Sequence, residues 1–219
     1  MSFPSIQPIG PIRPIDFTRL EVLFSGQSVT VLLRAAFIAA LVQLVTAVLI
    51  KHTPKSEMDG KNTTIYHIVT AVAMSTMLFF FGWSTAFLKG VIFLLILLYA
   101  AVSDIQTREV SDCMSAMLLI AAFIGVEPKN YPYMAVSGLV IGGTLLLSAI
   151  ITKNRIGGAD IKLSAACATF LGLWDGVIGL MLGLLLSVII NLVLRRKEIK
   201  QGFPLVPYLA AGFMAAYIF

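Results

Sequence analysis

The sequence predicts an all-α polytopic membrane protein, and three observations support this fold class. The 219 residues are 58% hydrophobic and only 12% charged, whereas soluble domains carry about 25% charged residues. The mean hydropathy is +0.94. The apolar residues are gathered in long runs, and a helix needs about 20 such residues to cross a bilayer. We expect one transmembrane domain over residues 29–219, preceded by a proline-containing segment over residues 1–28.

About eight transmembrane helices are expected, and each ends at a polar, basic or glycine-containing break. They cover residues 30–50, 65–83, 86–103, 113–126, 133–151, 160–173, 177–194 and 204–219. The apolar run after Ile65 is too long for one helix and is divided at residues 82–89, where Trp83 suits a membrane interface. Residues 104–112 are expected to form a polar connection. Trp174-Asp175-Gly176 is expected to form a tight turn before the seventh span.

The loops on the two sides of these spans differ in their basic residues. One side holds eleven of the sixteen: Lys51, Lys55, Lys61, Arg108, Lys153, Arg155, Lys162, Arg195, Arg196, Lys197 and Lys200. The other side holds Arg13, Arg19, Lys89 and Lys129, and Arg34 lies within a span. The richer side is expected to be cytoplasmic. Both termini are then expected outside, and Asp104 and Asp160 both fall at the cytoplasmic boundary.

Several classes of function are disfavoured by composition. The net charge of +5 follows from basic cytoplasmic loops, so it does not indicate nucleic-acid binding. Cys113 and Cys167 are far apart in the sequence and form no zinc-binding or disulfide pattern. His52 and His67 are isolated, so no metal site is expected. The basic loops are expected to meet anionic lipid.

Two aspartates at the ends of separate spans are the candidate functional residues. A carboxylate at a membrane boundary is costly to desolvate and is a functional candidate for that reason. Asp160 follows Gly157, Gly158 and Ala159, whose small side chains admit a close approach by another backbone or a substrate strand. Asp160 begins a helix, so capping remains an alternative role. Asp104 ends a helix, where its negative charge opposes the macrodipole, so capping does not explain it.

Paired carboxylates have a defined chemistry. Their like charges disfavour double ionisation, so the pair shares one proton. The ionised member can take a proton from water while the protonated member activates a carbonyl, which hydrolyses a peptide bond without a covalent intermediate. The same residues suit proton coupling in a transporter. Asp112 and Asp175, each placed before a span, are expected to act as helix caps.

Three blocks of the sequence, in order, resemble the prepilin peptidases, the membrane aspartyl proteases that mature type IV pilins and archaeal flagellins. The blocks are Asp104–Asp112, Gly157–Leu163 and Phe203–Gly212. The resemblance covers residues 86–219 and implies a six-helix catalytic core preceded by two N-terminal helices. Ala159 stands where the family's Gly-x-Gly-Asp block has its second glycine, and Ser111-Asp112 stands where the first block has Pro-Asn. The short loop after the first span lacks the cysteine-rich domain of larger members, so the chain resembles a compact member.

The resemblance assigns roles to individual residues. Asp104 and Asp160 are implied to be the catalytic dyad. The implied active-site motif residues are Gly157, Gly158, Ala159, Lys162, Arg108, Pro204 and Pro207. The two prolines are expected either to hold irregular backbone near the dyad or simply to start the last span.

The implied substrate is a prepilin-like or preflagellin-like protein, with a short basic leader followed by an apolar helix, cut after a glycine at the cytoplasmic boundary. No cofactor is expected, and methylation with S-adenosylmethionine is not expected because no nucleotide site is visible. Two alternatives from other classes stay open: a proton-coupled transporter using the same carboxylates, and a non-catalytic assembly factor of a pilus or secretion system. The sequence does not predict an oligomeric state.

Overall fold

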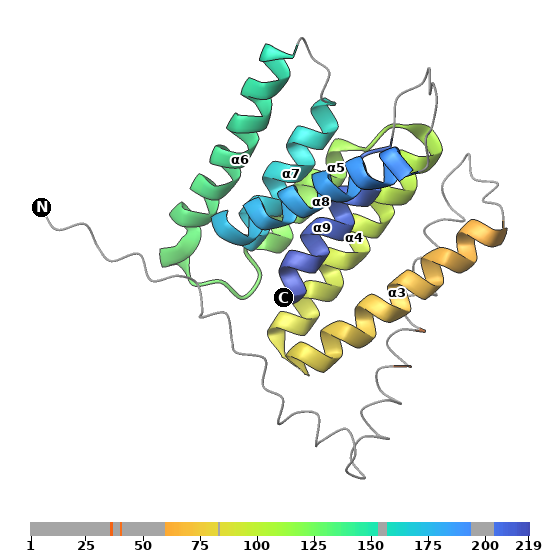
Figure 1. Cartoon of the computed structure of the whole chain (residues 1–219). Helices are drawn as coiled ribbons and strands as arrows, with labels where there is room; N and C mark the ends of the chain where they lie inside the picture. Colours follow the sequence, from red (N-terminus) through yellow and green to blue (C-terminus); the bar gives the residue numbers. More distant parts are fainter. Residues whose placement is uncertain (1–35, 37–39, 41–59, 83, 153–156, 194–203) are drawn as a thin grey trace, which may run out of the picture.

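The computed structural model describes residues 36, 40, 60–82, 84–152, 157–193 and 204–219. Regular structure in these ranges is entirely helical (Figure 1), which confirms the predicted all-α class. The elements are α3 (Gly60–Phe81), α4 (Thr85–Thr107), α5 (Asp112–Ala122), the 3₁₀ turn η1 (Pro128–Asn130), α6 (Tyr131–Ile151), α7 (Gly158–Leu171), α8 (Leu173–Val193) and α9 (Val206–Ile218). Each of the expected spans after residue 65 coincides with one of these helices.

Within the described residues, three helices are long and apolar enough to cross a membrane: α4, the η1–α6 unit and α8. Shorter apolar helices are formed by residues 68–81, α5 and α9. The first expected span, residues 30–50, lies outside the described part of the chain apart from two single helical positions, as does the segment 1–28. The expected number of eight spans therefore stays a prediction.

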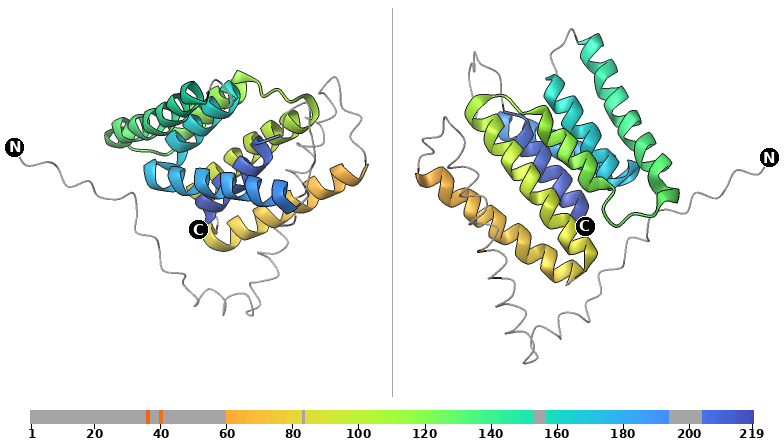
Figure 2. Two further views of the ribbon diagram at one scale, coloured as in Figure 1. Left: turned by 45° about the horizontal axis from the view of Figure 1, so that its top comes forward. Right: turned by 180° about the vertical axis from the view of Figure 1, so that it is seen from behind.

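Two helices, α4 and α9, form the centre of the bundle (Figures 1 and 2). Helix α9 packs against α4 and α8, and α7 packs against α5, α6 and α8. Core side chains come mainly from α4, α5, α7 and α9, with Phe93, Leu97, Leu118, Leu163 and Phe213 fully or almost fully buried. Helices α6 and α8 instead carry many exposed apolar side chains, which is the composition that a lipid-facing surface requires.

Stacked aromatic rings and glycine residues make close contacts between the helices. The rings of Phe93 on α4 and Phe170 on α7 stack with their centroids 4.3 Å apart, and Tyr217 on α9 lies against both. Gly212 on α9 lies directly against the backbone of Gly179 and Gly183 on α8. These contacts hold α9 at a fixed position relative to α4, α7 and α8.

Two element boundaries differ from the sequence prediction. Helix α4 continues to Thr107, so Asp104 lies in its last turn instead of beginning a loop. The second difference is at Trp174-Asp175-Gly176, which forms the start of α8 and not a tight turn. The break lies earlier, at Gly172, whose φ of +93° suits glycine and ends α7. Asp175 in the first turn of α8 is favoured there by the helix dipole.

Candidate active site

The carboxylate of Asp104 is held by the beginning of another helix. Asp104 is only 8% exposed, and its Oδ2 accepts a hydrogen bond from the backbone N–H of Val206 at 3.0 Å. The N–H of Leu205 also donates to it. The N–H groups of a helix's first turn have no partner within the helix. Asp104 supplies that partner for α9, from 102 residues earlier in the chain.

This contact corrects the argument that capping cannot explain Asp104. The charge does oppose the dipole of its own helix, α4, at whose C-terminal end it lies. It also lies at the N-terminal end of α9, where a negative charge is stabilised. A structural role for Asp104 therefore exists beside any chemical role.

The turn after Asp104 is tightly organised. Arg108 is the C-cap of α4 and has a φ of +58°. Among the described residues other than glycine, it alone has a positive φ. Its N–H donates to the Asp104 carbonyl at 3.1 Å. The hydroxyl groups of Ser103 and Thr107 both donate to the Glu109 carbonyl, at 2.7 and 3.1 Å. Arg108 is near enough to Asp104 for its charge to stabilise the carboxylate.

Asp160 lies in the first turn of α7 and its side chain folds back on the N-cap residue. The N–H of Gly157 donates to its carboxylate, which is the contact that an acidic residue makes at the third position of a capping box. A Cβ built on Gly157 would lie 2.8 Å from Asp160 Oδ2. Gly157 has an ordinary extended φ of −63°. A side chain at this position would therefore displace the Asp160 carboxylate, although the backbone conformation would accept one.

The other two small residues of this stretch have different surroundings. A Cβ on Gly158 would meet nothing within 4 Å, and Gly158 is exposed while Ala159 is half-buried. The open space at Gly158 leaves room for the approach of another backbone, as predicted from the glycines.

The two aspartates lie at the same end of the bundle. The C-terminal end of α4 and the N-terminal ends of α5, α7 and α9 meet there (Figures 1 and 2). Asp104 and Asp160 are near enough for their negative charges to repel each other. Asp160 is half-buried and Asp104 buried, so their charges are screened less than at the surface. Two carboxylates that repel each other in this way disfavour double ionisation.

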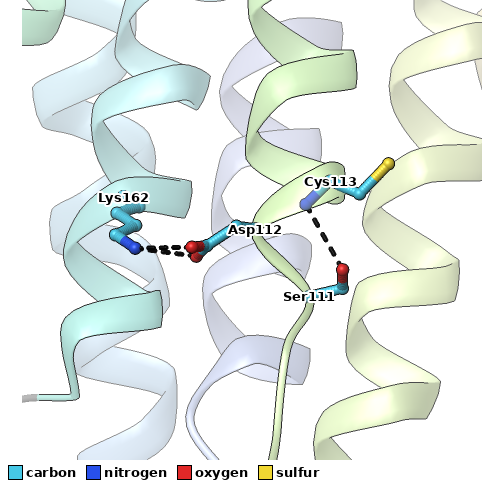
Figure 3. Close-up of polar contacts among 4 residues, drawn as sticks. All are labelled: Ser111, Asp112, Cys113 and Lys162. Atoms are coloured by element: carbon cyan, nitrogen blue, oxygen red, sulfur yellow. Dashed lines mark hydrogen bonds and ion pairs between the residues drawn. The ribbon is translucent and has the colours of Figure 1, made fainter.

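A third acidic residue, which sequence reasoning assigned to capping, makes a different contact. Ser111 caps α5 through its hydroxyl, which accepts the Cys113 N–H at 3.3 Å. Asp112 instead accepts two hydrogen bonds from Lys162 Nζ, both at 2.8 Å (Figure 3). This ion pair joins the first of the aspartate blocks to the second. The sequence placed both residues at helix starts but gave no signal for their pairing across 50 residues.

The prolines of the third block start α9. Pro207 is at the second position of the helix, where a missing N–H costs nothing because that group has no partner within the helix. Pro204 is buried just before the helix. The irregular segment between them presents the N–H groups of Leu205 and Val206 to Asp104. The two expected roles of the prolines are therefore compatible with each other. The same residues can start α9 and shape the backbone near Asp104.

Other predicted groups fall elsewhere. The basic loop residues Lys153 and Arg155, and the run 195–200, lie outside the described residues. In the part of the chain that the structure describes, no three His, Cys, Asp or Glu side chains lie together as a metal site would need. The chemistry available at the described site is that of the two carboxylates and the backbone N–H groups around them.

Comparison with known proteins covers the part of the chain that carries both aspartates. Residues 91–195 match the family model described as the type IV leader peptidase family, and this range contains both aspartates. Over this range the chain is similar to the type IV leader peptidase family. No solved structure matches the chain significantly.

A curated member of similar sequence extends the match. The prepilin leader peptidase/N-methyltransferase of Bacillus subtilis (strain 168) is 27% identical over 158 residues, or 69% of this chain and 64% of that protein. The match therefore spans less than two thirds of the relative's length. The family model ends before Pro204, so the contact between α9 and Asp104 is an observation of the structure alone.

Proposed function

We propose that the protein is a membrane-embedded aspartyl endopeptidase that removes the short basic leader of a prepilin-like or preflagellin-like substrate. The observation that carries the proposal is that the last turn of α4, with Asp104, and the first turn of α7, with Asp160, lie at the same end of the bundle (Figure 1). The chain is similar to the type IV leader peptidase family over residues 91–195, which include both aspartates. Cleavage takes place at the cytoplasmic boundary of the membrane, with both termini of the chain outside, as the distribution of basic residues predicts.

The dyad performs the hydrolysis with one shared proton. The ionised carboxylate takes a proton from a water molecule, whose oxygen attacks the carbonyl carbon of the scissile peptide bond. The protonated carboxyl donates its proton to the carbonyl oxygen, which gives a neutral tetrahedral diol. The carboxyl that took the proton from water then donates it to the peptide nitrogen, while the other carboxylate takes a proton from a hydroxyl of the diol. The C–N bond breaks, and the carbonyl re-forms as a carboxyl group. The dyad is left with one proton, ready for the next cycle.

The surroundings of each aspartate serve this reaction. Fixed hydrogen bonds from Val206 and Gly157 hold the two carboxylates in place, so little reorganisation is needed during proton transfer. Exposed Gly158 lies beside Asp160 and leaves room for an extended substrate segment. An apolar helix following the leader would remain in the lipid beside the bundle, with the leader at the polar boundary.

The test uses purified protein in liposomes and a panel of prepilin-like substrates with basic leaders. Leader removal is followed by mass spectrometry for wild type, Asp104→Asn and Asp160→Asn. We expect wild type to cut after a glycine, and each variant to lose about 10²–10⁴-fold in rate because one proton-transfer partner is gone. Cleavage at the wild-type rate in either variant would remove that aspartate from the mechanism.

The same assay decides between the proposal and the other classes. Folded wild-type protein that cuts no substrate, but moves protons across the liposome membrane with a solute, would be a transporter. Folded protein that does neither, while supporting pilus or secretion assembly with both aspartates replaced, would be an assembly factor. Addition of S-adenosylmethionine tests methylation directly, because the new N-terminus would gain the mass of one methyl group.

A further inference from the structure

The ion pair between Asp112 and Lys162 joins the two helix ends that carry the aspartate blocks. Lys162 Nζ lies 2.8 Å from both carboxylate oxygens of Asp112, across 50 residues of sequence. Figure 3 shows the two side chains reaching toward each other from α5 and α7. Both side chains are more than half exposed. Exposed ion pairs contribute little to folding stability. Any role of this pair is therefore in positioning the two helix ends relative to each other.

The first turn of α7 carries Asp160, whose carboxylate accepts the Gly157 N–H. That contact lies within the turn and does not tie it to another helix. Its N-cap, Gly157, has no side chain with which to cap the helix. Full burial of α7 begins only at Leu163. Asp160 therefore lies on a turn that extends beyond the packed core. Helix ends of this kind fray readily unless a contact holds them.

The partner of Lys162 is anchored more firmly. Ser111 caps α5 next to Asp112, and α5 contributes fully buried Leu118 to the core. The chain just before Ser111 is tied to α4 by the hydrogen bonds of Ser103 and Thr107 to Glu109. Asp112 is thus fixed relative to the last turn of α4, where Asp104 lies.

We propose that Asp112 and Lys162 form a positioning pair, which fixes the first turn of α7 and thereby the separation between Asp160 and Asp104. The inference rests on the proposed peptidase function. Lys162 acts through the backbone of its own turn, two residues beyond Asp160, and neither member of the pair touches the reacting atoms.

The test is a double-mutant cycle measured by cleavage kinetics. The variants are Asp112→Asn, Lys162→Gln, both together, and the charge-reversed pair Asp112→Lys with Lys162→Asp. We expect each single change to lower kcat about tenfold with KM nearly unchanged, because small displacements of a catalytic group are costly. The double neutral variant should be no slower than either single variant, since a coupled pair is non-additive. Charge reversal should recover kcat to within about threefold of wild type.

A matched ion pair provides the control. Lys129 and Glu127 form an exposed salt bridge beside η1, away from the aspartates. The changes Glu127→Gln and Lys129→Gln should leave both kcat and KM at wild-type values. Wild-type kcat in the two single variants at Asp112 and Lys162, or a charge-reversed pair as slow as the singles, would overturn the inference while leaving the peptidase function intact.

Cross-linking separates the geometry from the activity. In a Cys113→Ser background, Asp112→Cys combined with Lys162→Cys should be cross-linked by a short bifunctional thiol reagent, because the lysine side chain lets the two backbones lie farther apart than a disulfide spans. Asp112→Cys with Lys129→Cys should not be cross-linked. Absence of the first cross-link in folded protein would overturn the pair itself. If wild type cleaves no substrate, the proposed peptidase function is wrong. The role of the pair in positioning Asp160 for catalysis is then wrong too, even if the cross-link forms.

Discussion

The carboxylate of Asp104 accepts a hydrogen bond from the backbone N–H of Val206 at 3.0 Å, so the end of α4 and the start of α9 meet at one buried charge. This relationship makes a single side chain both a helix cap and a candidate catalytic acid. It also means that the position of Asp104 depends on how α9 packs against α8. Substitutions can separate the two roles of Asp104 and test that dependence.

Replacing Asp104 by asparagine or by alanine should separate capping from catalysis. The amide oxygen of Asp104→Asn can still accept the Val206 N–H, so folding stability should stay close to wild type while cleavage is lost. Asp104→Ala removes the acceptor and should also lower the free energy of unfolding by about 1 kcal/mol, the usual cost of losing an N-terminal cap. Unfolding in mixed micelles and the cleavage assay measure the two effects. Equal stability of the two variants would show that the contact with α9 contributes nothing to folding.

Gly157 should tolerate no side chain, because of Asp160. A Cβ at this position would lie 2.8 Å from Asp160 Oδ2, so Gly157→Ala should displace the carboxylate and lower kcat by about tenfold or more. Gly143→Ala is the control, since a Cβ there meets nothing within 4 Å. Gly158→Ala adds a second comparison: a change in KM alone would indicate substrate contact at that residue. Wild-type kcat in Gly157→Ala would contradict the prediction.

The helices themselves followed from the sequence, because long apolar runs separated by polar breaks leave few alternatives in lipid. The end of α4 was misplaced because Asp104 and its polar neighbours resemble a loop. At a membrane boundary, however, a helix can continue into water, and here it ends only at Arg108. The aspartates stood out because a charge at the end of an apolar run is unusual.

The partners of those aspartates were not predictable in the same way. The donor to Asp104 is a backbone N–H, which every residue other than proline possesses, so only the packing of α9 selects Val206. The pair of Asp112 with Lys162 depends on the packing of α5 against α7, over 50 residues of intervening chain. Local patterns placed both residues at helix starts but carried no information about which starts are adjacent.

Lys89 should stabilise the opposite end of the bundle without affecting catalysis. Its ammonium group donates to the Ala122 carbonyl at 2.8 Å and lies 4.8 Å from the centre of the Phe170 ring. It therefore closes the C-terminal end of α5 instead of lying in a loop. Lys89→Met leaves that carbonyl unpaired and should lower the free energy of unfolding by about 1–2 kcal/mol.

Its kinetic effect should be small for a geometric reason. Lys89 and Asp104 are fifteen residues apart on one helix, or about 22 Å at 1.5 Å per residue. We expect kcat to change less than about twofold, because the dyad's own contacts are untouched. Lys129→Met, at an exposed position, should change the free energy of unfolding by less than about 0.5 kcal/mol. If Lys89→Met is as stable as wild type, the desolvation cost of the half-buried ammonium group equals the stabilisation from its two contacts.

Gly212 should link the packing of α8 and α9 to the dyad. A Cβ on Gly212 would fall against backbone atoms of Gly179 and Gly183, and backbone cannot move aside as a flexible side chain can. Gly212→Ala should therefore push α9 away from α8 and lower the free energy of unfolding by about 1–3 kcal/mol. Because Val206 starts the same helix, the displacement should also shift the donor of Asp104 and reduce kcat. Gly143→Ala, which adds the same methyl group in open space, should do neither. If Gly212→Ala lowers the free energy of unfolding but leaves kcat unchanged, α9 bends between Val206 and Gly212. The displacement at Gly212 then does not reach the dyad.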